Sequence, residues 1–369
     1  MMAEPVPARR LGWLGLVTSV TLFFTLGSGV QLLSPGVGIW FTEILLFLGS
    51  GWALIRWSGR DPVRYARLFW PGVKPLVLAF LLSVANYFAF VIPLQLLAQS
   101  VAPASWVEFF DQGRVFERRG NVELALVITG AVVAAPIGEE FIFRALYLQG
   151  LLRSGLTVAR AVMASAIVFS ICHWDPIGFP ARLELGVLFG LLFCRTGSLW
   201  PGIVAHFGNN LTATVIYLAD RLQESPGTTV SSPNTIIVGL AGMGLAAMAM
   251  ILYAARSIPG AWGQPREIPA DRPRVQLSRA TAPWVLAAGL IVAGWLLIDR
   301  RGVELDMVDL KIHLPTEKSD EADWVRKRRV ELEALRSRVR RGEVGVQNYA
   351  EARRALSQEL QSNARTERL

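Results

Sequence analysis

Long apolar runs, separated by short polar segments, fill most of this chain. Most of these runs reach the roughly 18 residues that an α-helix needs to cross a bilayer. The predicted spanning helices are residues 11–33, 37–56, 73–98, 122–152, 156–173, 182–195, 198–218, 235–256 and 282–298. The run at 182–195 is short for a full crossing, so we expect it to be re-entrant or joined to a neighbour. The pattern predicts an all-α, polytopic membrane helix bundle of about eight or nine spans.

The same pattern divides the chain into four parts. Residues 1–121 form N-terminal transmembrane helices, and residues 122–218 hold nearly all the polar groups that interrupt apolar runs. Residues 219–299 contain further transmembrane helices and a linker, and residues 300–369 form a charged tail. In the tail, apolar residues recur at helical spacing on both sides of Gly342, which predicts two helices joined by a turn. Their apolar stripe is suited to bind a partner helix.

Composition and charge agree with a membrane protein. The chain is 52% hydrophobic and 18% charged, with a mean hydropathy of +0.40, whereas soluble proteins carry about 25% charged residues. Its net charge of +8 comes from arginines in loops and the tail, and membrane topology accounts for such an excess. No sequence pattern of a nucleic-acid-binding module accompanies it. The expected partner is therefore the lipid bilayer, and no nucleic acid is expected.

Two arginines, Arg9 and Arg10, precede the first apolar run. They resemble the charged start of a signal peptide, but the run is too long and no small-residue cleavage site follows it. We therefore expect an uncleaved first span. This anchor and the arginine-rich loops predict a multi-pass protein of the bacterial inner membrane, with its N-terminus in the cytoplasm.

Two adjacent glutamates lie inside the fourth apolar run. Glu139 and Glu140 are followed by Arg144, and charged groups in hydrocarbon are costly enough to indicate a functional site. Glu140 and Arg144 are four residues apart and can pair on a helix, whereas Glu139 points about 100° away. One glutamate can then be held by the arginine while the other is free for chemistry.

Two of the three histidines also interrupt or end apolar runs. Phe169 precedes His173 by four residues, and His206 precedes Asn210 by four, so each pair shares one helical face. His313 lies in the tail and is predicted to be a surface residue. A buried histidine is more often a satisfied core residue, and a Glu–Arg pair is more often structural. Their joint occurrence in one block of spanning helices nevertheless favours a catalytic site.

These groups suit the hydrolysis of a peptide bond within a bilayer. Such a reaction needs a water molecule, a base, and donors for the developing oxyanion. A carboxylate in a low-dielectric site can act as the base, and a neighbouring imidazole can share the proton. A second imidazole and an amide NH₂ group on one helical face can stabilise the oxyanion.

The three motifs resemble those of a known family. The motifs are Glu139-Glu140-x-x-x-Arg144, Phe169-x-x-x-His173 and His206-x-x-x-Asn210, and they occur in this order between about residues 122 and 218. They resemble the motifs of the CAAX-protease and bacteriocin-processing membrane proteins, called the Abi or CPBP family. This family includes relatives of the Ras-converting prenyl-protein endopeptidase. The flanking helices and the tail carry no equivalent match.

The resemblance implies a CAAX-type intramembrane endopeptidase of the glutamate type. It assigns catalysis to Glu139, His173, His206 and Asn210, and support of the site to Glu140, Arg144 and Phe169. Within this set, Glu139 and His173 would activate the water. His206 and Asn210 would stabilise the oxyanion.

Members of the family have also been described as metal-dependent. Glu139, His173 and His206 supply a carboxylate and two imidazoles, a combination that can bind zinc. No H-E-x-x-H segment is present, however, and both histidines are needed elsewhere in the water-activation scheme. We therefore favour a metal-free mechanism without a cofactor and keep zinc as the alternative.

Two other functions remain open. A proton-coupled transporter would use the Glu and His residues as a relay, but we find no repeated halves with broken helices. A catalytically silent membrane partner, such as an immunity or scaffold protein, would tolerate the loss of these groups. The expected partner of the endopeptidase is a protein or peptide substrate at the membrane. In a bacterium, a small peptide or a C-terminal sorting helix is more plausible than a prenylated C-a-a-X end.

Overall fold

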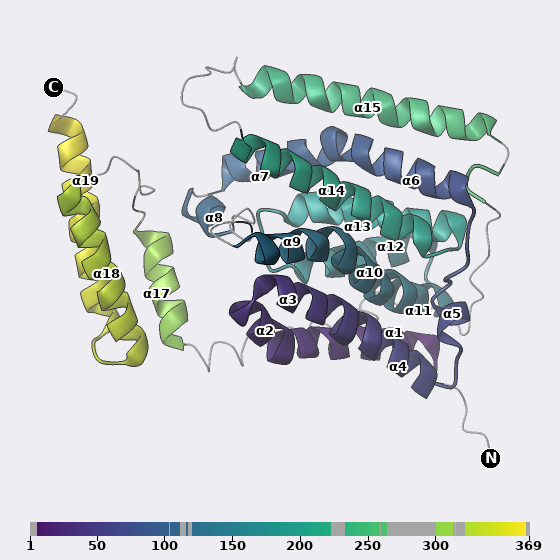
Figure 1. The fold of residues 1–369 in the computed structure, drawn as a ribbon, viewed down its shortest axis with the longest axis horizontal. Coiled ribbons are helices and arrows are strands. Elements are labelled where there is room, and N and C mark those ends of the chain that lie inside the picture. Colours follow the sequence, from purple (N-terminus) through teal and green to yellow (C-terminus); the bar gives the residue numbers. More distant parts are fainter. Residues whose placement is uncertain are drawn as a thin grey trace. The chain divides into compact units, whose positions relative to one another are not determined.

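The computed structural model consists of helices joined by turns, and the described residues contain no strand. It describes residues 6–102, 104–110, 116, 120–222, 233–258, 260–263, 300–312, 314 and 322–366. The chain forms two compact units, one of residues 1–101 with 110–287 and the other of residues 102–109 with 288–369. Each unit is described by itself (Figure 1).

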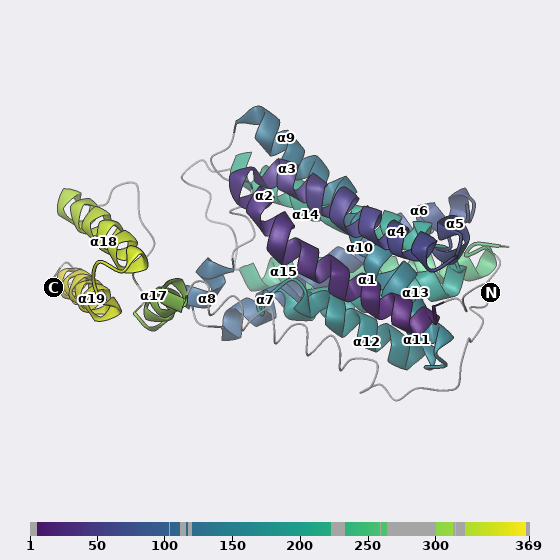
Figure 2. The same cartoon turned by 90° about the horizontal axis from the view of Figure 1, so that it is seen from below.

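The first unit is a bundle of long helical rods, several of which contain π-helical turns (Figures 1 and 2). The first rod comprises α1 (Ala8–Leu22), η1 (Phe23–Gly27) and α2 (Ser28–Leu33), and the second comprises α3 (Pro35–Trp40), η2 (Phe41–Gly49) and α4 (Ser50–Trp57). After the short α5 (Pro62–Tyr65), the third rod comprises α6 (Val73–Asn86), η3 (Tyr87–Val91) and α7 (Ile92–Val101). The fourth comprises α9 (Asn121–Thr129), η5 (Gly130–Ala134), α10 (Ala135–Glu140), η6 (Phe141–Leu148) and α11 (Gln149–Arg153). Four further helices of the unit lie within the described residues: α12 (Val158–Ile171), α13 (Phe179–Thr196), α14 (Trp200–Leu222) and α15 (Pro233–Ser257).

The turn between the first two rods shows how local sequence sets a boundary. Ser34 adopts an extended conformation, its hydroxyl caps the following helix by accepting from the Val37 N–H, and Pro35 fills the first helical position. Glu123 of α9 accepts from the Ser34 hydroxyl at 2.9 Å and from the Gly36 N–H at 2.8 Å. These bonds satisfy the helix start and tie it to the fourth rod.

The predicted membrane helix bundle is confirmed. Among the described residues, five helices are long and apolar enough to cross a membrane: Ala8–Leu33, Pro35–Trp57, Val73–Val101, Asn121–Arg153 and Gly239–Arg256. The other predicted spans up to residue 256 are also helices, but α12 is shorter, with 14 residues. The segment predicted at 182–195 is a continuous helix, α13. The predicted span at 282–298 and His313 lie outside the described residues.

The fourth rod occupies the interior of the bundle at its midpoint. Every residue of η6 is buried, because α1, η2, α12 and α13 all pack against it. A second cluster of buried apolar residues joins three other helices, and it contains Ala79 and Leu82 of α6, Leu185, Phe189 and Leu192 of α13, and Ala205 of α14. The two glutamates therefore lie on a rod that neighbouring helices shield.

The second unit contains the predicted helical hairpin of the tail. Its helices are α8 (Ala104–Phe109), α17 (Arg300–Lys311), α18 (Asp323–Arg341) and α19 (Val346–Thr366). Gly342 ends α18 with a left-handed conformation, at a φ of 81°. The Tyr349 hydroxyl donates to Asp309 of α17 at 2.7 Å, and burial together with this carboxylate raises the pKa of Tyr349. The hairpin thus packs against α17, a helix that the apolar spacing in the tail did not predict.

Candidate active site

The two glutamates occupy a segment with unusual helical geometry. α10 lies between the π-helical turns of η5 and η6, and such turns occur often at functional sites. Glu140 is fully buried, whereas 14% of the Glu139 side chain is exposed. The sequence prediction that the two carboxyl groups differ in environment agrees with this arrangement.

Arg144 holds Glu140 in place. Its Nη1 lies 2.9 Å from Glu140 Oε1, and both side chains are fully buried. Its Nη2 donates to the Gly186 carbonyl at 3.2 Å. The guanidinium carbon lies 4.6 Å from the ring centroid of Phe169 and 5.3 Å from that of Phe189. A buried ion pair needs such additional partners to offset its desolvation.

Close approach by α14 brings His206 to the same carboxylate. A Cβ on Gly202 would lie 2.8 Å from Glu140 Oε2, so only glycine leaves room here without displacing Glu140. One turn later, His206 Nδ1 lies 3.2 Å from Glu140 Oε1, and the ring stacks on Phe189 with centroids 4.8 Å apart. Neither the His206–Glu140 contact nor Phe189 was predicted, because no local motif joins residues on different helices.

His173 and His206 converge on one oxygen of Glu139. His173 Nδ1 lies 2.8 Å from the Phe169 carbonyl, which can only accept, so this nitrogen carries the hydrogen. By the same argument His206 Nδ1 carries the hydrogen that points at Glu140. The Nε2 atoms of both rings then lie 3.8 Å from Glu139 Oε2. That oxygen is buried and has no hydrogen-bond partner among the described residues.

Asn210 lies one turn beyond His206 on α14. Its NH₂ group donates to the Ala131 carbonyl of η5 at 2.9 Å, and its Oδ1 accepts from Asn209 at 3.0 Å. The structure therefore brings Glu139, His173 and His206 together, while one amide hydrogen of Asn210 is used by the backbone. The second amide hydrogen is the one left for another acceptor.

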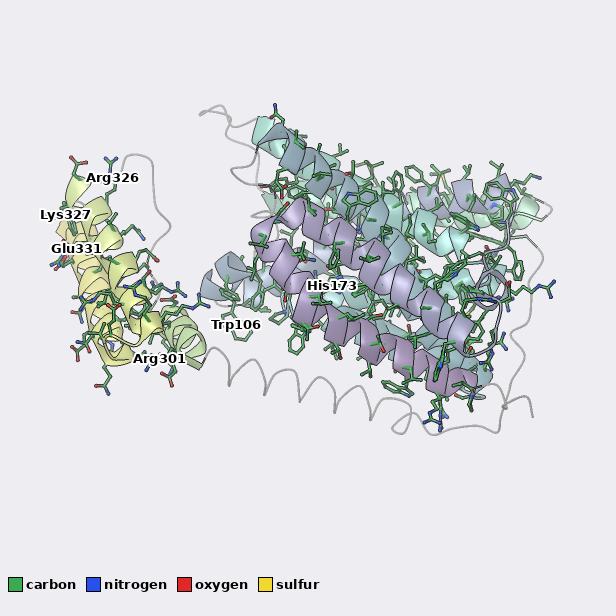
Figure 3. All side chains as sticks on the ribbon, turned by 60° about the horizontal axis from the view of Figure 1, so that its bottom comes forward. Trp106, His173, Arg301, Arg326, Lys327 and Glu331 are labelled. Carbon is green, nitrogen blue, oxygen red and sulfur yellow. The ribbon has the colours of Figure 1, made fainter. Side chains whose placement is uncertain are left out.

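A short turn places His173 at the depth of Glu139. Because α12 ends at Ile171, the next residues lie within the bundle, and Figure 3 shows His173 among its helices. Asp175 fixes the turn, since its Oδ1 accepts from the Ile177 N–H at 2.9 Å and the Gly178 N–H at 3.0 Å. Its Oδ2 pairs with Arg182 of α13 at 2.5 Å. The sequence did not predict that α12 is short. Because α12 ends early, His173 lies at the same level of the bundle as Glu139.

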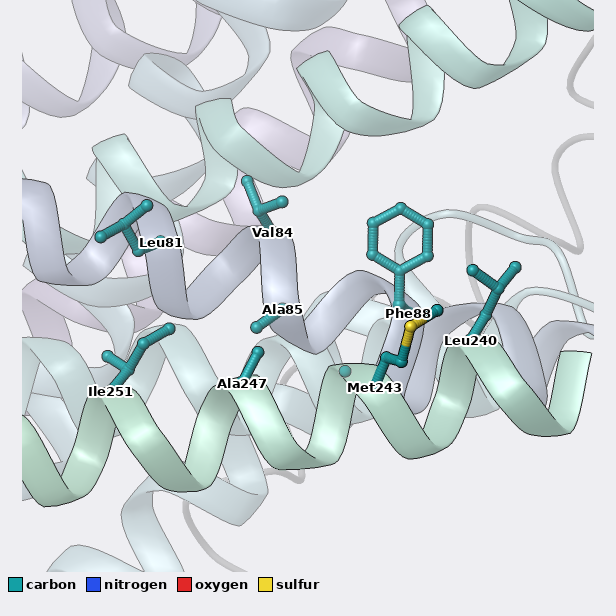
Figure 4. A pocket seen from close by; sticks show the side chains of 9 residues that line it. Leu81, Val84, Ala85, Phe88, Leu240, Met243, Ala247 and Ile251 are labelled. Carbon is teal, nitrogen blue, oxygen red and sulfur yellow. The ribbon is translucent and has the colours of Figure 1, made fainter.

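A cavity of about 460 Å³ opens beside Glu139 and His173. Most of its wall is apolar and includes Leu16, Val20, Phe23, Phe24, Phe47, Ile142, Phe143 and Trp174. A second pocket of about 370 Å³ lies between α15 and the third rod (Figure 4). Its lining carries no ionisable or nucleophilic side chain: Leu81, Val84, Ala85, Phe88, Leu240, Met243, Gly244, Ala247 and Ile251. Only the first of these two pockets therefore offers groups for chemistry.

Glu43 is a third carboxyl group at this cavity. It belongs to η2, is 7% exposed and lines the cavity together with Glu139. A Cβ on Gly138 would lie 2.5 Å from both the carbonyl oxygen and Oε2 of Glu43, so glycine allows η2 to pack against α10. A lone acidic residue in the second apolar run was the available signal, and the sequence analysis missed it.

The zinc alternative can be compared with the arrangement of these side chains. Glu139, His173 and His206 have the right donor chemistry. As they lie here, the described residues contain no group of three or more His, Cys, Asp or Glu side chains that could hold a metal ion. No chemical step below is routed through a metal.

Comparison with known proteins gives two matches. Residues 121–212 match the family model described as Type II CAAX prenyl endopeptidase Rce1-like. The chain is 27% identical over 146 residues to "Putative membrane peptidase YdiL" of Bacillus subtilis (strain 168), which covers 38% of this chain and 57% of the relative. The chain thus spans little more than half of that relative. No solved structure matches the chain. The segment matched by the family model contains all three motifs and the converging side chains.

Proposed function

We propose that this chain, whose residues 121–212 match the CAAX prenyl endopeptidase family, is an intramembrane endopeptidase with Glu139 as its base. The convergence of two imidazole Nε2 atoms on Glu139 Oε2, each at 3.8 Å, supports this proposal most directly. These separations are too long for direct hydrogen bonds but suit a water molecule held between the groups. Such a site would lie among the helices of the multi-pass bundle.

Water activation would use Glu139 and His173. With Nδ1–H held by the Phe169 carbonyl, His173 presents its Nε2 lone pair toward Glu139. A water between them can donate one hydrogen to each acceptor, and its oxygen is then free to attack a carbonyl carbon. Transfer of one water proton to Glu139 generates the nucleophile as the bond to the substrate carbon forms.

Oxyanion stabilisation would use His206 and Asn210. His206 Nδ1 lies against Glu140 Oε1, which fixes the ring orientation, and a hydrogen on His206 Nε2 would donate to the oxyanion. The second amide hydrogen of Asn210 lies one turn away on the same helix. When the tetrahedral intermediate collapses, Glu139 returns its proton to the amine nitrogen of the leaving group, which restores the carboxylate.

The substrate would be a peptide segment at the membrane. The apolar cavity beside Glu139 suits an apolar segment, and a small peptide or a C-terminal sorting helix of an exported protein has this character. We place the enzyme in a bacterial inner membrane, on the basis of its arginine-rich loops. The zinc alternative remains to be tested by measurement of bound metal.

The decisive experiment incubates the purified full chain in lipid nanodiscs with a library of internally quenched peptides. The library includes apolar peptides and peptides that end in a prenylated C-a-a-X sequence, and mass spectrometry identifies the cleaved bond. We expect cleavage by the wild-type chain and a loss of about a hundredfold or more in Glu139→Gln. Glu184→Gln is the matched control, because Glu184 hydrogen-bonds to Asn86 and does not line the cavity. Equal activity in wild type and Glu139→Gln would contradict the proposal.

A further inference from the structure

The cavity beside Glu139 contains two buried polar groups that the proposed chemistry does not use. Ser19 of α1 and Glu43 of η2 both line the cavity and are 1% and 7% exposed. Ser19 Oγ and Glu43 Oε2 have no hydrogen-bond partner among the described residues. Buried polar atoms without partners are costly, and both of these belong to residues that line one cavity, which points to a ligand that completes their hydrogen bonds.

A third polar residue of the same cavity shows how a serine hydroxyl is usually satisfied in a helix. Ser28 also lines it, but its hydroxyl donates to the Phe24 carbonyl at 2.9 Å, as serines in membrane helices often do. The hydroxyl hydrogen of Ser19 is not used in this way. Glu43 is also held firmly, because η2 lies against Gly138 with no room for a Cβ between them.

A peptide substrate would supply backbone N–H and C=O groups as hydrogen-bond partners for Ser19 and Glu43. Around the bond to be cleaved, a substrate must be unwound, and its backbone N–H and C=O groups then lose their helical partners. Inside an apolar cavity these groups need replacements. A carboxyl oxygen accepts from an N–H whether or not it is charged, and a serine hydroxyl donates to a C=O.

We propose that Ser19 and Glu43 form a backbone-binding pair, which holds the substrate as an extended segment between the first two rods and Glu139. This assignment rests on the proposed peptidase function. Glu43 accepts a hydrogen bond from a substrate N–H, and Ser19 donates one to a substrate C=O. The pair positions the scissile bond and takes no part in proton transfer.

The test measures KM and kcat separately for the shortest quenched peptide that the wild-type chain cleaves, in nanodiscs. Glu43→Leu and Ser19→Ala should each raise KM about tenfold or more and leave kcat nearly unchanged, because each removes a bond made on binding. Glu43→Gln should keep a KM close to that of wild type, since its amide oxygen still accepts. Ser50→Ala is the control, because the Ser50 hydroxyl donates to the Leu46 carbonyl of the same rod and Ser50 does not line the cavity; it should leave both constants unchanged.

Backbone N-methylation of the peptide tests the pairing directly. Methylating one amide at a time removes single N–H donors. One position should raise KM in the wild-type chain and cause no further increase in Glu43→Leu, which identifies the N–H that Glu43 binds. If Glu43→Leu does not fold, the same peptides are compared in wild type and Ser19→Ala. Methylation of the amide that Glu43 binds should then raise KM by the same factor in both, because Ser19 binds a different substrate group.

Several results would overturn the assignment. A wild-type KM in both Glu43→Leu and Ser19→Ala would show that the pair does not bind substrate. A Glu43→Gln variant as impaired as Glu43→Leu would show that a negative charge, and not a backbone acceptor, is required. If the wild-type chain cleaves no peptide, the proposed function itself fails, which is a separate outcome from these.

Discussion

His206 Nδ1 and Glu140 Oε1 lie 3.2 Å apart, although the two residues are 66 positions apart in the chain. Arg144 contacts the same carboxylate oxygen at 2.9 Å. The orientation of the His206 ring therefore depends on an ion pair that is fully buried. Glu140 thus contacts both Arg144, which stabilises the fold, and His206, which is proposed to act in catalysis. Variants of these partners can be compared for their effects on stability and on activity.

Arg144→Ala should destabilise the protein far more than Glu139→Gln does. Removing Arg144 leaves the fully buried Glu140 without its cation, and breaking a buried pair costs about 3–5 kcal/mol. Glu139→Gln keeps the shape of a side chain that is not part of that pair. The protein level and the thermal unfolding temperature in nanodiscs should both fall in Arg144→Ala and stay unchanged in Glu139→Gln. Equal folding defects in both variants would show that Glu139 is structural.

Gly202→Ala should reduce activity through the position of Glu140. The added methyl group would lie 2.8 Å from Glu140 Oε2, and such overpacking typically costs about 1–3 kcal/mol. Displacing Glu140 also rotates His206, so kcat should fall about tenfold or more. Gly242→Ala on α15 is the control, since a methyl group there meets nothing within 4 Å. A fully active Gly202→Ala variant would argue against a fixed His206.

Asp175→Ala should lower kcat by loosening His173. The variant loses two hydrogen bonds to backbone N–H groups of the turn and the pair with Arg182, and one such hydrogen bond contributes about 0.5–1.5 kcal/mol. Asp61→Ala is a matched control, because Asp61 caps α5 by accepting from the Arg64 N–H and does not line the cavity. Peptide hydrolysis by the two variants, measured beside their unfolding temperatures, separates loss of position from loss of stability.

Removal of metal should leave the reaction intact under the glutamate mechanism. Treatment with a zinc chelator, followed by elemental analysis of the purified protein, should give unchanged hydrolysis and less than stoichiometric zinc. Loss of activity together with stoichiometric zinc, and its recovery when zinc is restored, would instead support the metal alternative. Glu139, His173 and His206 would then have to move into a tighter arrangement.

The tail should be dispensable for hydrolysis. Its helices α17, α18 and α19 carry none of the three motifs, and their core of Leu332, Val339 and Tyr349 belongs to the second unit. A chain that ends near Arg301 should cleave a short peptide at the wild-type rate. The short chain should no longer retain a partner that the tail binds, which a pull-down compared with the full chain would detect. Loss of hydrolysis in a well-folded short chain would place part of the active site in the tail.

Much of this fold follows from the sequence because membrane helices satisfy their own backbone. Apolar length was therefore enough to locate the helices, and the spacing of Glu140 and Arg144 was enough to predict their pair. The contacts of Glu43, Phe189 and the His206–Glu140 pair were missed for one physical reason. Each depends on how closely two helices approach, and Gly138 and Gly202 set two of those approaches. The spacing of apolar residues predicts which face of a helix is buried, but it does not predict the distance to the neighbouring helix.

The short α12 has a consequence for the supply of the second reactant. At 1.5 Å per residue its 14 residues extend about 21 Å, less than the roughly 30 Å of a hydrocarbon layer. Non-helical backbone at such depth is tolerated only where protein buries it or where it lines an aqueous cavity. We therefore expect the barrier to water to be thinnest at the turn that carries His173. Hydrolysis inside a membrane needs a route for water, and the missing third of one helix would provide that route.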